Sequence, residues 1–200
     1  MPLDILTSIE KAQIKRDVKD LMEDTDFRYK ILYRRLASSS FNPSTGTTTP
    51  TWTEVAINAY RGDHSAREIA FSNGLLKVGD QFYVFDPALL SFVPRGDDRI
   101  WHNVTETGTV DVDNGATTVD GVATKAQAHG VQGGDILRIG AVDAVIKSVT
   151  SDLAFVLRTG WTGSNITNSA FAIYRIFENV NWLQDPIAAS IKVSVRMAGS

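Results

Sequence analysis

The chain of 200 residues contains no cysteine. Disulfide scaffolds, thiolate zinc sites, iron–sulfur ligation and cysteine nucleophiles are therefore excluded. No apolar run approaches the roughly 20 residues that a membrane span needs, so no membrane partner is expected. The first residues lack the charged and apolar regions of a signal peptide, so we expect the protein to be made and to reside inside a cell. The formal net charge of −3 is not the basic excess usual in a dedicated nucleic-acid binder.

The amino-acid composition changes along the chain. Segment 105–170 holds 9 of the 15 glycines, but only 4 of the 20 lysines and arginines and 2 of the 18 aromatic residues. It also accounts for the whole net negative charge. Such a change in composition predicts a separate module at 105–170, inserted into a host domain made of 1–104 and 171–200.

The host domain is expected to begin with an amphipathic helix. Thr7-Ser8-Ile9-Glu10 has the form of a capping box, and Asp4 is an alternative cap. The expected apolar stripe comprises Ile5, Ile9, Val18, Leu21 and Met22. The acidic stretch 23–26 is expected to end this helix, because carboxylates oppose the negative end of the helix dipole.

Strands are expected in the rest of the host. Alternation places Phe27, Tyr29, Ile31 and Tyr33 on one face of a first strand. A polar loop is expected at 38–53, too long for a tight hairpin, and loops of this length are usually binding loops. Further strands are predicted at 54–61, 66–71, 81–85, 97–101, 171–181 and 187–197. The host is thus predicted to be a six- or seven-stranded antiparallel barrel or sandwich.

The inserted module is expected to consist of short strands. Asn114-Gly115 is a strong turn signal between strands at 108–112 and 117–122. Three more are predicted at 135–139, 144–149 and 154–157, as in a small sandwich or open barrel. The predicted fold class is therefore mainly β, a small antiparallel barrel or sandwich with one N-terminal helix and an inserted all-β domain.

Residues that could carry chemistry do not form a pattern typical of an enzyme. The three histidines, His64, His102 and His129, are far apart and none has a second histidine at metal-ligand spacing. Asp111-Val-Asp113-Asn-Gly115 resembles the start of a calcium loop but lacks its later ligands, and Arg61-Gly-Asp63 is an ordinary turn sequence. Asp97-Asp98 could act as paired acids of a hydrolase, a minor alternative. We expect no catalytic residue, cofactor or metal, and a protein that is not an enzyme.

A group of basic residues near the start of the first strand is one candidate site. It comprises Arg28, Lys30, Arg34 and Arg35. One interpretation is a solvated face balanced by Asp17, Asp20 and Glu23. The other is a subunit interface or a surface facing DNA phosphates, where cations attract without reading sequence. The residues leave both interpretations open.

The order of motifs in the host resembles the head-closure (stopper) proteins in the head–tail connector of tailed bacteriophages. A short helix precedes an aromatic strand, followed by Phe41-Asn-Pro-Ser-Thr-Gly46 and Thr53-Glu-Val-Ala-Ile-Asn58. Next come Val78-Gly-Asp-Gln-Phe-Tyr-Val-Phe85, Asp97-Asp-Arg-Ile100 and a closing strand that ends in Ser194-Val-Arg196. The resemblance covers about 130 residues in two pieces. A simple head-closure protein lacks the insert. The alternative roles of a tail-completion protein or an adaptor protein therefore remain open.

The resemblance implies a function without covalent chemistry. Copies would form a cyclic ring, sixfold or twelvefold, beneath the portal and adaptor rings after DNA packaging. The ring would close the channel through which double-stranded DNA passes and offer a surface to tail-terminator or tail proteins. The location implied is the head–tail junction of the virion, with assembly in the host cytoplasm. The candidate channel or inter-ring loop would comprise Phe41, Asn42, Pro43, Ser44, Thr45, Gly46 and Thr47.

The insert is similar to β-modules common in phage tail, neck and decoration proteins. The residues that carry this likeness include Gly108-Thr-Val-Asp-Val-Asp-Asn-Gly115, Gly133-Gly-Asp-Ile-Leu-Arg-Ile139 and Trp161-Thr-Gly163. Such modules face outward and contact neighbours or cell-surface sugars. An alternative function follows, that of a virion-surface decoration or binding protein acting through the module, with the host domain as its anchor.

Overall fold

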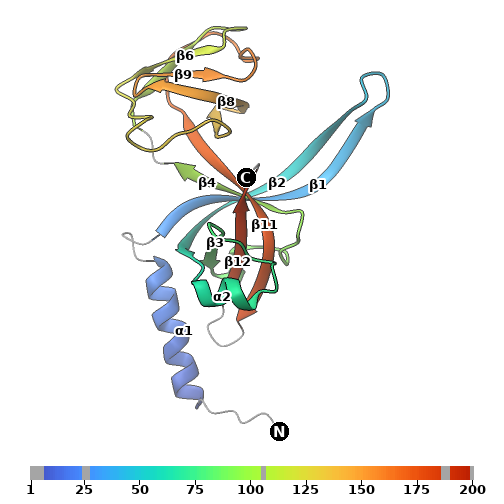
Figure 1. Ribbon diagram of the computed structural model, residues 1–200, viewed down its shortest axis with the longest axis vertical. Coiled ribbons are helices and arrows are strands. Elements are labelled where there is room, and N and C mark those ends of the chain that lie inside the picture. Colours follow the sequence, from blue (N-terminus) through green and yellow to red (C-terminus); the bar gives the residue numbers. More distant parts are fainter. Residues whose placement is uncertain (1–6, 24–27, 105–106, 186–189, 199–200) are drawn as a thin grey trace. The chain divides into compact units, whose positions relative to one another are not determined.

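The computed structural model describes residues 7–23, 28–104, 107–185 and 190–198. The described chain is mainly β, as the sequence predicts, with twelve strands and a 16-residue helix near the N-terminus (Figure 1). Two compact units divide it. The first comprises 1–100 with 177–198, and the second comprises 101–176. Both boundaries between the units fall inside strands.

The first unit contains two α-helices, α1 (Ser8–Glu23) and α2 (Ala66–Phe71), and a short 3₁₀ helix, η1 (Pro87–Leu89). Its strands are β1 (Arg28–Asn42), β2 (Thr47–Asp63), β3 (Gln81–Phe85), β12 (Ser190–Met197), and parts of β4 (Arg99–Val104) and β11 (Ala172–Asp185). They are hydrogen-bonded in the order β11-β12-β3-β2-β1-β4, and β4 also pairs with β11. The order of strands in this unit therefore closes on itself.

Alternating side chains build the core of this unit. Ile31 and Tyr33 of β1 are buried as the alternation predicts, whereas Tyr29 is largely exposed and Phe27 lies outside the described residues. Strands β3 and β12 contribute further buried side chains from alternating positions. The buried cluster comprises Ile31, Tyr33, Ile57, Ala59, Tyr83, Phe85, Leu90, Ile100, Phe177, Ile191, Val193 and Val195.

Helix α1 begins at the expected capping box. The Thr7 hydroxyl oxygen accepts a hydrogen bond from the Glu10 amide at 3.2 Å, and the Glu10 carboxylate accepts one from the Thr7 amide at 2.7 Å. These bonds satisfy amide groups that have no partner in the first turn of a helix. Ile9 is largely exposed. The rest of the expected apolar stripe, Ile5, Val18, Leu21 and Met22, lies outside the described residues and side chains.

The strand predicted at 66–71 is wrong, because these residues form helix α2. Ser65 is its N-cap and Glu68 its third residue, and their side chains and backbone amides bond reciprocally. This second capping box stabilises the first turn of the helix. The Ser-x-x-Glu pattern was present in the sequence, so the helix could have been recognised.

The polar loop predicted at 38–53 is also wrong. Strand β1 continues to Asn42 and β2 begins at Thr47, so a long antiparallel hairpin replaces the loop. Its register runs from Arg28 opposite Tyr60 to Asn42 opposite Thr47, with an irregularity between Leu36 and Ser38. Threonine is a good strand former because its branched side chain suits the pleated backbone. Polarity on both faces conceals the alternation by which strands are recognised.

The second unit is also all-β. Its strands are β5 (Thr109–Val112), β6 (Thr118–Val122), β7 (Ile136–Ile139), β8 (Val142–Ser151), β9 (Ala154–Leu157) and β10 (Ile166–Ser169). They follow the order β10-β5-β6-β9-β8-β7, and the first part of β11 pairs with β7. The turn at Asn114-Gly115 joins β5 to β6 as predicted, whereas β10 was not anticipated. Trp161 and Phe155 are fully buried within the separate core of this unit.

Candidate functional site: the hairpin arm and its base

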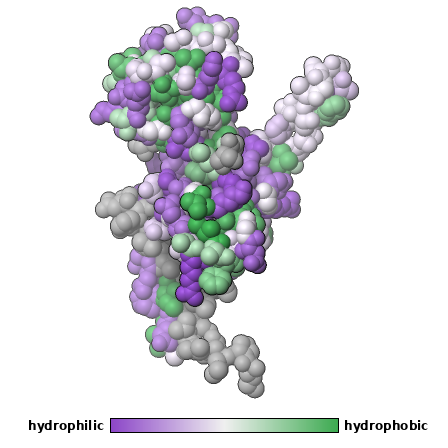
Figure 2. Space-filling view, in the orientation of Figure 1, coloured by the Kyte–Doolittle hydropathy of each residue, from purple (hydrophilic) through white to green (hydrophobic). Residues whose placement is uncertain are grey.

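The outer half of the β1–β2 hairpin, residues 37–51, is the most unusual surface of the first unit and is called the arm below. Every residue from Ala37 to Thr51 is exposed, so both faces of this two-stranded ribbon are open to solvent. None of these residues is charged. Figure 2 accordingly shows the arm mostly in the near-white of serine, threonine and glycine. A lone two-stranded hairpin is marginally stable in water, so the arm is a surface suited to contact with another molecule.

Local hydrogen bonds shape the tip of the arm. The carbonyl oxygen of Asn42 accepts from the amides of Thr45 and Gly46 at 3.3 and 2.8 Å. The side-chain oxygen of Asn42 also accepts from the Ser44 amide at 3.0 Å. Gly46 closes the turn with φ of +67°, in the left-handed region that glycine adopts without strain. The structure thus places all seven candidate loop residues, 41–47, at this turn and its flanking strand ends.

Phe41 is the large apolar side chain at this tip. It is 64% exposed and lies opposite Thr48 in the ladder. Burying a phenylalanine side chain yields about 1.5–3 kcal/mol relative to leaving it in water. An exposed phenylalanine on an uncharged ribbon therefore favours contact with an apolar surface.

The basic candidates of β1 divide into two pairs with different surroundings. Arg28 and Lys30 are exposed near the start of the strand. Arg34 is buried, lies 2.8 Å from Glu54 and stacks over the ring of Trp52 at 5.2 Å. Arg35 lies on the opposite face and pairs with Asp98. The structure therefore does not bring the four together as one basic surface, and only Arg28 and Lys30 offer charge to solvent.

Asp98 fixes the base of the arm to the rest of the unit. Its carboxylate is 1% exposed and accepts two hydrogen bonds from the guanidinium of Arg35, at 3.1 and 3.0 Å. It also accepts from the hydroxyl of Tyr33 at 2.9 Å and from the Arg95 amide at 2.7 Å. Burial, reinforced by the Asp98 charge, raises the pKa of Tyr33 far above its ordinary value. These contacts show a structural role for Asp98, whereas Asp97 is exposed.

A cavity of about 580 Å³ lies where the arm leaves the unit. Ser39, Thr48 and Pro50 of the arm line one side, and Trp52 and Arg99, whose guanidinium lies 5.2 Å from the Trp52 ring, line another. Glu178 and Asn179 of β11 line a further part, and Leu36, Gly96, Asp97 and Asp98 complete its wall. Three carboxylates, those of Asp97, Asp98 and Glu178, belong to its lining, and the Asp98 carboxylate is already paired with Arg35 and hydrogen-bonded by Tyr33.

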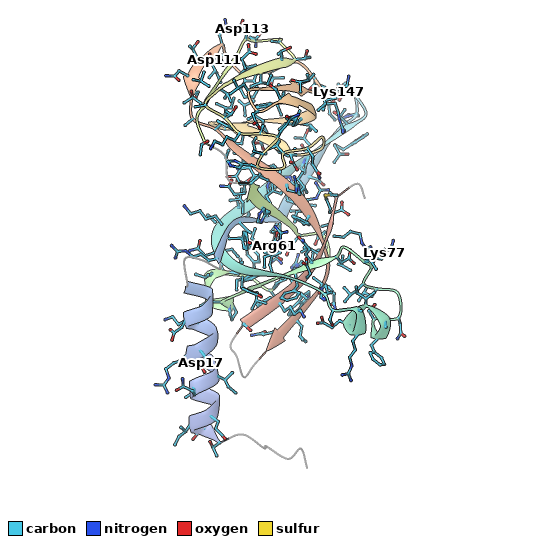
Figure 3. The ribbon with its side chains drawn as sticks, turned by 60° about the vertical axis from the view of Figure 1, so that its left-hand side comes forward. Asp17, Arg61, Lys77, Asp111, Asp113 and Lys147 are labelled. Carbon is cyan, nitrogen blue, oxygen red and sulfur yellow. The ribbon has the colours of Figure 1, made fainter. Side chains whose placement is uncertain are left out.

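The remaining sequence candidates lie apart from one another. His64 is buried in the first unit, His102 is buried in β4, and His129 is exposed in the second unit. Asp111 and Asp113 lie at one end of the second unit, beside the β5–β6 turn (Figure 3). Within the described residues, no three histidine or acidic side chains are grouped so that they could hold a metal ion. No described helix is long and apolar enough to cross a membrane.

A second hollow beside α2 was missed by the sequence reasoning. It has a volume of about 360 Å³ and is lined by residues of α2, the turn after it, and strands β11 and β12. Its members come from residues 64–76 and from the paired strands β11 and β12, more than 100 positions further along the chain, and the prediction of a strand at 66–71 hides the helical wall. The Ser65-x-x-Glu68 capping box was the available signal for the helix that forms its wall.

Comparison with known proteins gives little information. No protein-family model matches this chain, and no curated protein matches it either. Among solved structures, a chain described as the phage phi92 endosialidase is similar with a TM-score of 0.26 and 14% identity. The similarity covers 90% of this chain and 30% of that one, so this chain spans less than a third of its length. Similarity at this level does not define a shared fold, and nothing about function follows from it.

Proposed function

We propose that this chain is a structural protein of the head–tail connector, or neck, of a tailed bacteriophage. Copies of it form a ring that closes the portal channel after DNA packaging, and the far face of this ring receives the tail. The proposal requires no catalysis and no cofactor. It takes the order of motifs in the host domain as its starting point and the arm as its working part.

The observation that carries the proposal is the exposed, uncharged arm. A channel that conducts DNA must not hold its phosphates by ion pairs, because basic groups bind the DNA backbone without regard to sequence. Residues 37–51 contain no charge, so an arm placed in the lumen can obstruct DNA without binding it tightly. Arg28 and Lys30 are exposed at the other end of β1, where they can contact a neighbouring subunit or ring.

The base of the arm is held in a fixed position by buried hydrogen bonds. The hydrogen bonds from Tyr33, Arg35 and Arg95 converge on Asp98 and hold the start of the arm firmly. Beyond that point the ribbon has no core of its own. A rigid base and a weakly stabilised ribbon allow the arm to block a channel and to shift when DNA leaves.

A shortened arm tests this function. Ser38 and Thr51 lie directly opposite each other in the ladder, so an Asn-Gly turn can join them in place of residues 39–50. The fold should persist because the removed residues are exposed and lie outside both cores. Particles carrying this variant should assemble heads but lose packaged DNA. The matched control is Thr45→Ala, which keeps the hairpin and should retain the genome; full retention by the shortened variant would contradict the proposal.

A further inference from the structure

The hollow beside α2, called the α2 groove below, has an apolar wall open to solvent. Phe71 is 76% exposed, Leu75 47% and Leu183 64%, and all three line the groove together with Leu76 and Trp182. Figure 2 shows apolar surface gathered around α2. Large apolar side chains exposed side by side mark contact sites more often than isolated ones do.

The groove presents little free charge to an occupant. Its charged lining residues are Glu68 and Lys192, which pair with each other at 2.7 Å. Lys192 also lies over the ring of Phe82 at 4.1 Å. Since these charges are mutually satisfied, the groove is matched to an uncharged, apolar partner.

The floor of the groove offers hydrogen bonds that the chain itself does not use. The side chain of His64 is 2% exposed and lines the groove. Within the described residues neither of its ring nitrogens has a hydrogen-bond partner, and the Glu68 carboxylate lies 3.7 Å from Nδ1. A neutral imidazole needs one donor and one acceptor. An occupant bearing hydroxyl groups can supply both.

The tip of the arm has the features that this groove requires. It carries the exposed phenyl ring of Phe41, no charge, and the hydroxyls of Ser40, Ser44 and Thr45. Serine and threonine hydroxyls donate and accept at once. The tip is therefore complementary to the groove in apolar character, in charge and in hydrogen bonding.

The tip cannot reach the groove of its own chain. Thr48, opposite Phe41, is separated from Asp63 by 15 positions of the single strand β2, and α2 follows directly after that strand. At ~3.3 Å per residue the two sites lie roughly 50 Å apart along the strand. The groove can accept a tip only from another copy, and a contact between different surfaces of identical chains builds rings or filaments.

We propose that the arm of one copy seats Phe41 in the α2 groove of the next copy around the ring. This contact, called the joint below, rests on the proposed function and deepens it: the tip joins each copy to the next, while the ribbon between base and tip borders the lumen and obstructs DNA. A standard interface uses about 20–30 residues on each side, and the arm supplies 15. The contact is therefore weak between free chains. It becomes stronger in a closed ring, because the ring holds each tip near a groove at a high effective concentration.

Site-specific cross-linking tests the joint directly, because the chain has no cysteine of its own. Ser40→Cys, beside Phe41, and Asn181→Cys, in the groove lining, leave both contact side chains in place. The two proteins, mixed at about 1 mM to match the effective concentration of a tethered partner, should form a disulfide-linked dimer under mild oxidation. The matched control pairs Ser40→Cys with Val122→Cys, an exposed position in the second unit. The control should link at least tenfold less. Equal linking in both mixtures, or no linking in either, would overturn the proposal.

A complementation experiment tests the direction of the contact. Phe41→Asp puts a charge in place of the apolar side chain at the tip, and Leu183→Asp puts a charge in the apolar wall of the groove. Each variant alone should therefore remain monomeric at 1 mM. Their mixture retains one intact tip and one intact groove and should form a dimer that grows no further, as seen by sedimentation. A mixture that stays monomeric while wild type associates contradicts the proposal. Both positions are exposed, so the variants should fold, and circular dichroism would check this.

The two proposals fail in different ways. Labelling at the head–tail junction without the cross-link between residues 40 and 181 would overturn the joint and leave the neck function standing. The cross-link in a protein located elsewhere on the virion would overturn the neck function and leave the joint standing.

Discussion

The hydroxyl of Tyr33 donates a hydrogen bond of 2.9 Å to the carboxylate of Asp98, and both side chains are almost fully buried. The bond joins β1, just before the arm begins, to the loop that leads into β4. Arg35 binds the same carboxylate through two nitrogen atoms. This cluster anchors the base of the arm to the rest of the first unit.

Asp98→Asn should destabilise the first unit. The substitution keeps the shape of the side chain but removes the charge that Arg35 and Tyr33 face. Breaking a buried ion pair costs about 3–5 kcal/mol, and the partial exposure of Arg35 places the expected loss at the lower end of that range. Urea unfolding measures it. Asp97→Asn is the control, since Asp97 is exposed and its replacement should change the unfolding free energy by less than about 0.5 kcal/mol. Equal effects of the two variants would contradict the role of Asp98.

The basic residues of β1 should fall into two classes by their contribution to the stability of the fold. Arg28→Gln with Lys30→Gln should leave stability within about 0.5 kcal/mol of wild type, because both side chains are exposed. Arg35→Gln should cost about 2–3 kcal/mol, because it leaves the Asp98 carboxylate buried without its cation. Thermal unfolding of the three proteins checks the order. Equal stability of Arg35→Gln and wild type would show that the ion pair does not hold the arm.

Glu68 should make stability depend on pH in the acid range. Hydrogen bonds from Lys192 and from the Ser65 amide lower the pKa of Glu68 from 4.5 to about 2. Because the folded pKa is depressed, the stabilisation is complete above the unfolded value of 4.5 and is lost as pH falls toward 2. Glu68→Gln should therefore flatten the stability profile between pH 5 and 2. An unchanged slope in that window would contradict the assignment.

Gly108 should be essential to the second unit alone. Its φ is +85°, and an added Cβ would overlap the backbone carbonyl oxygen of Val122. Gly108→Ala should cost about 3 kcal/mol, whereas Gly115→Ala, at φ of +80° but in open space, should cost about 1 kcal/mol. Hydrogen exchange followed by peptide should show loss of protection in 107–170 only. Equal loss in the first unit would show that the two cores are coupled.

The parts of this fold that were predictable are those with a local signal. The β3 strand, the Asn114-Gly115 turn and the Thr7 capping box follow from short-range alternation, turn chemistry and capping. A strand predicted at 187–197 is likewise present as β12, with Ile191, Val193 and Val195 buried. In each case neighbouring residues alone determine the outcome.

The parts that were not predictable depend on pairing between distant residues. The sequence of the arm predicts a loop because its strands are exposed to solvent on both faces and therefore show no hydrophobic alternation. The α2 groove is assembled from residues more than 100 positions apart, such as Glu68 and Lys192. Arg34 and Arg35 resembled free surface charge because Glu54 and Asp98, their partners, are distant in sequence.

Locating the protein in purified particles tests the central claim most directly. An antibody against the second unit, followed by electron microscopy, reports the position without altering the arm. The account predicts label confined to the junction of head and tail. Label spread over the capsid or along the tail would contradict it and would favour the alternative function, in which the inserted unit is the binding part.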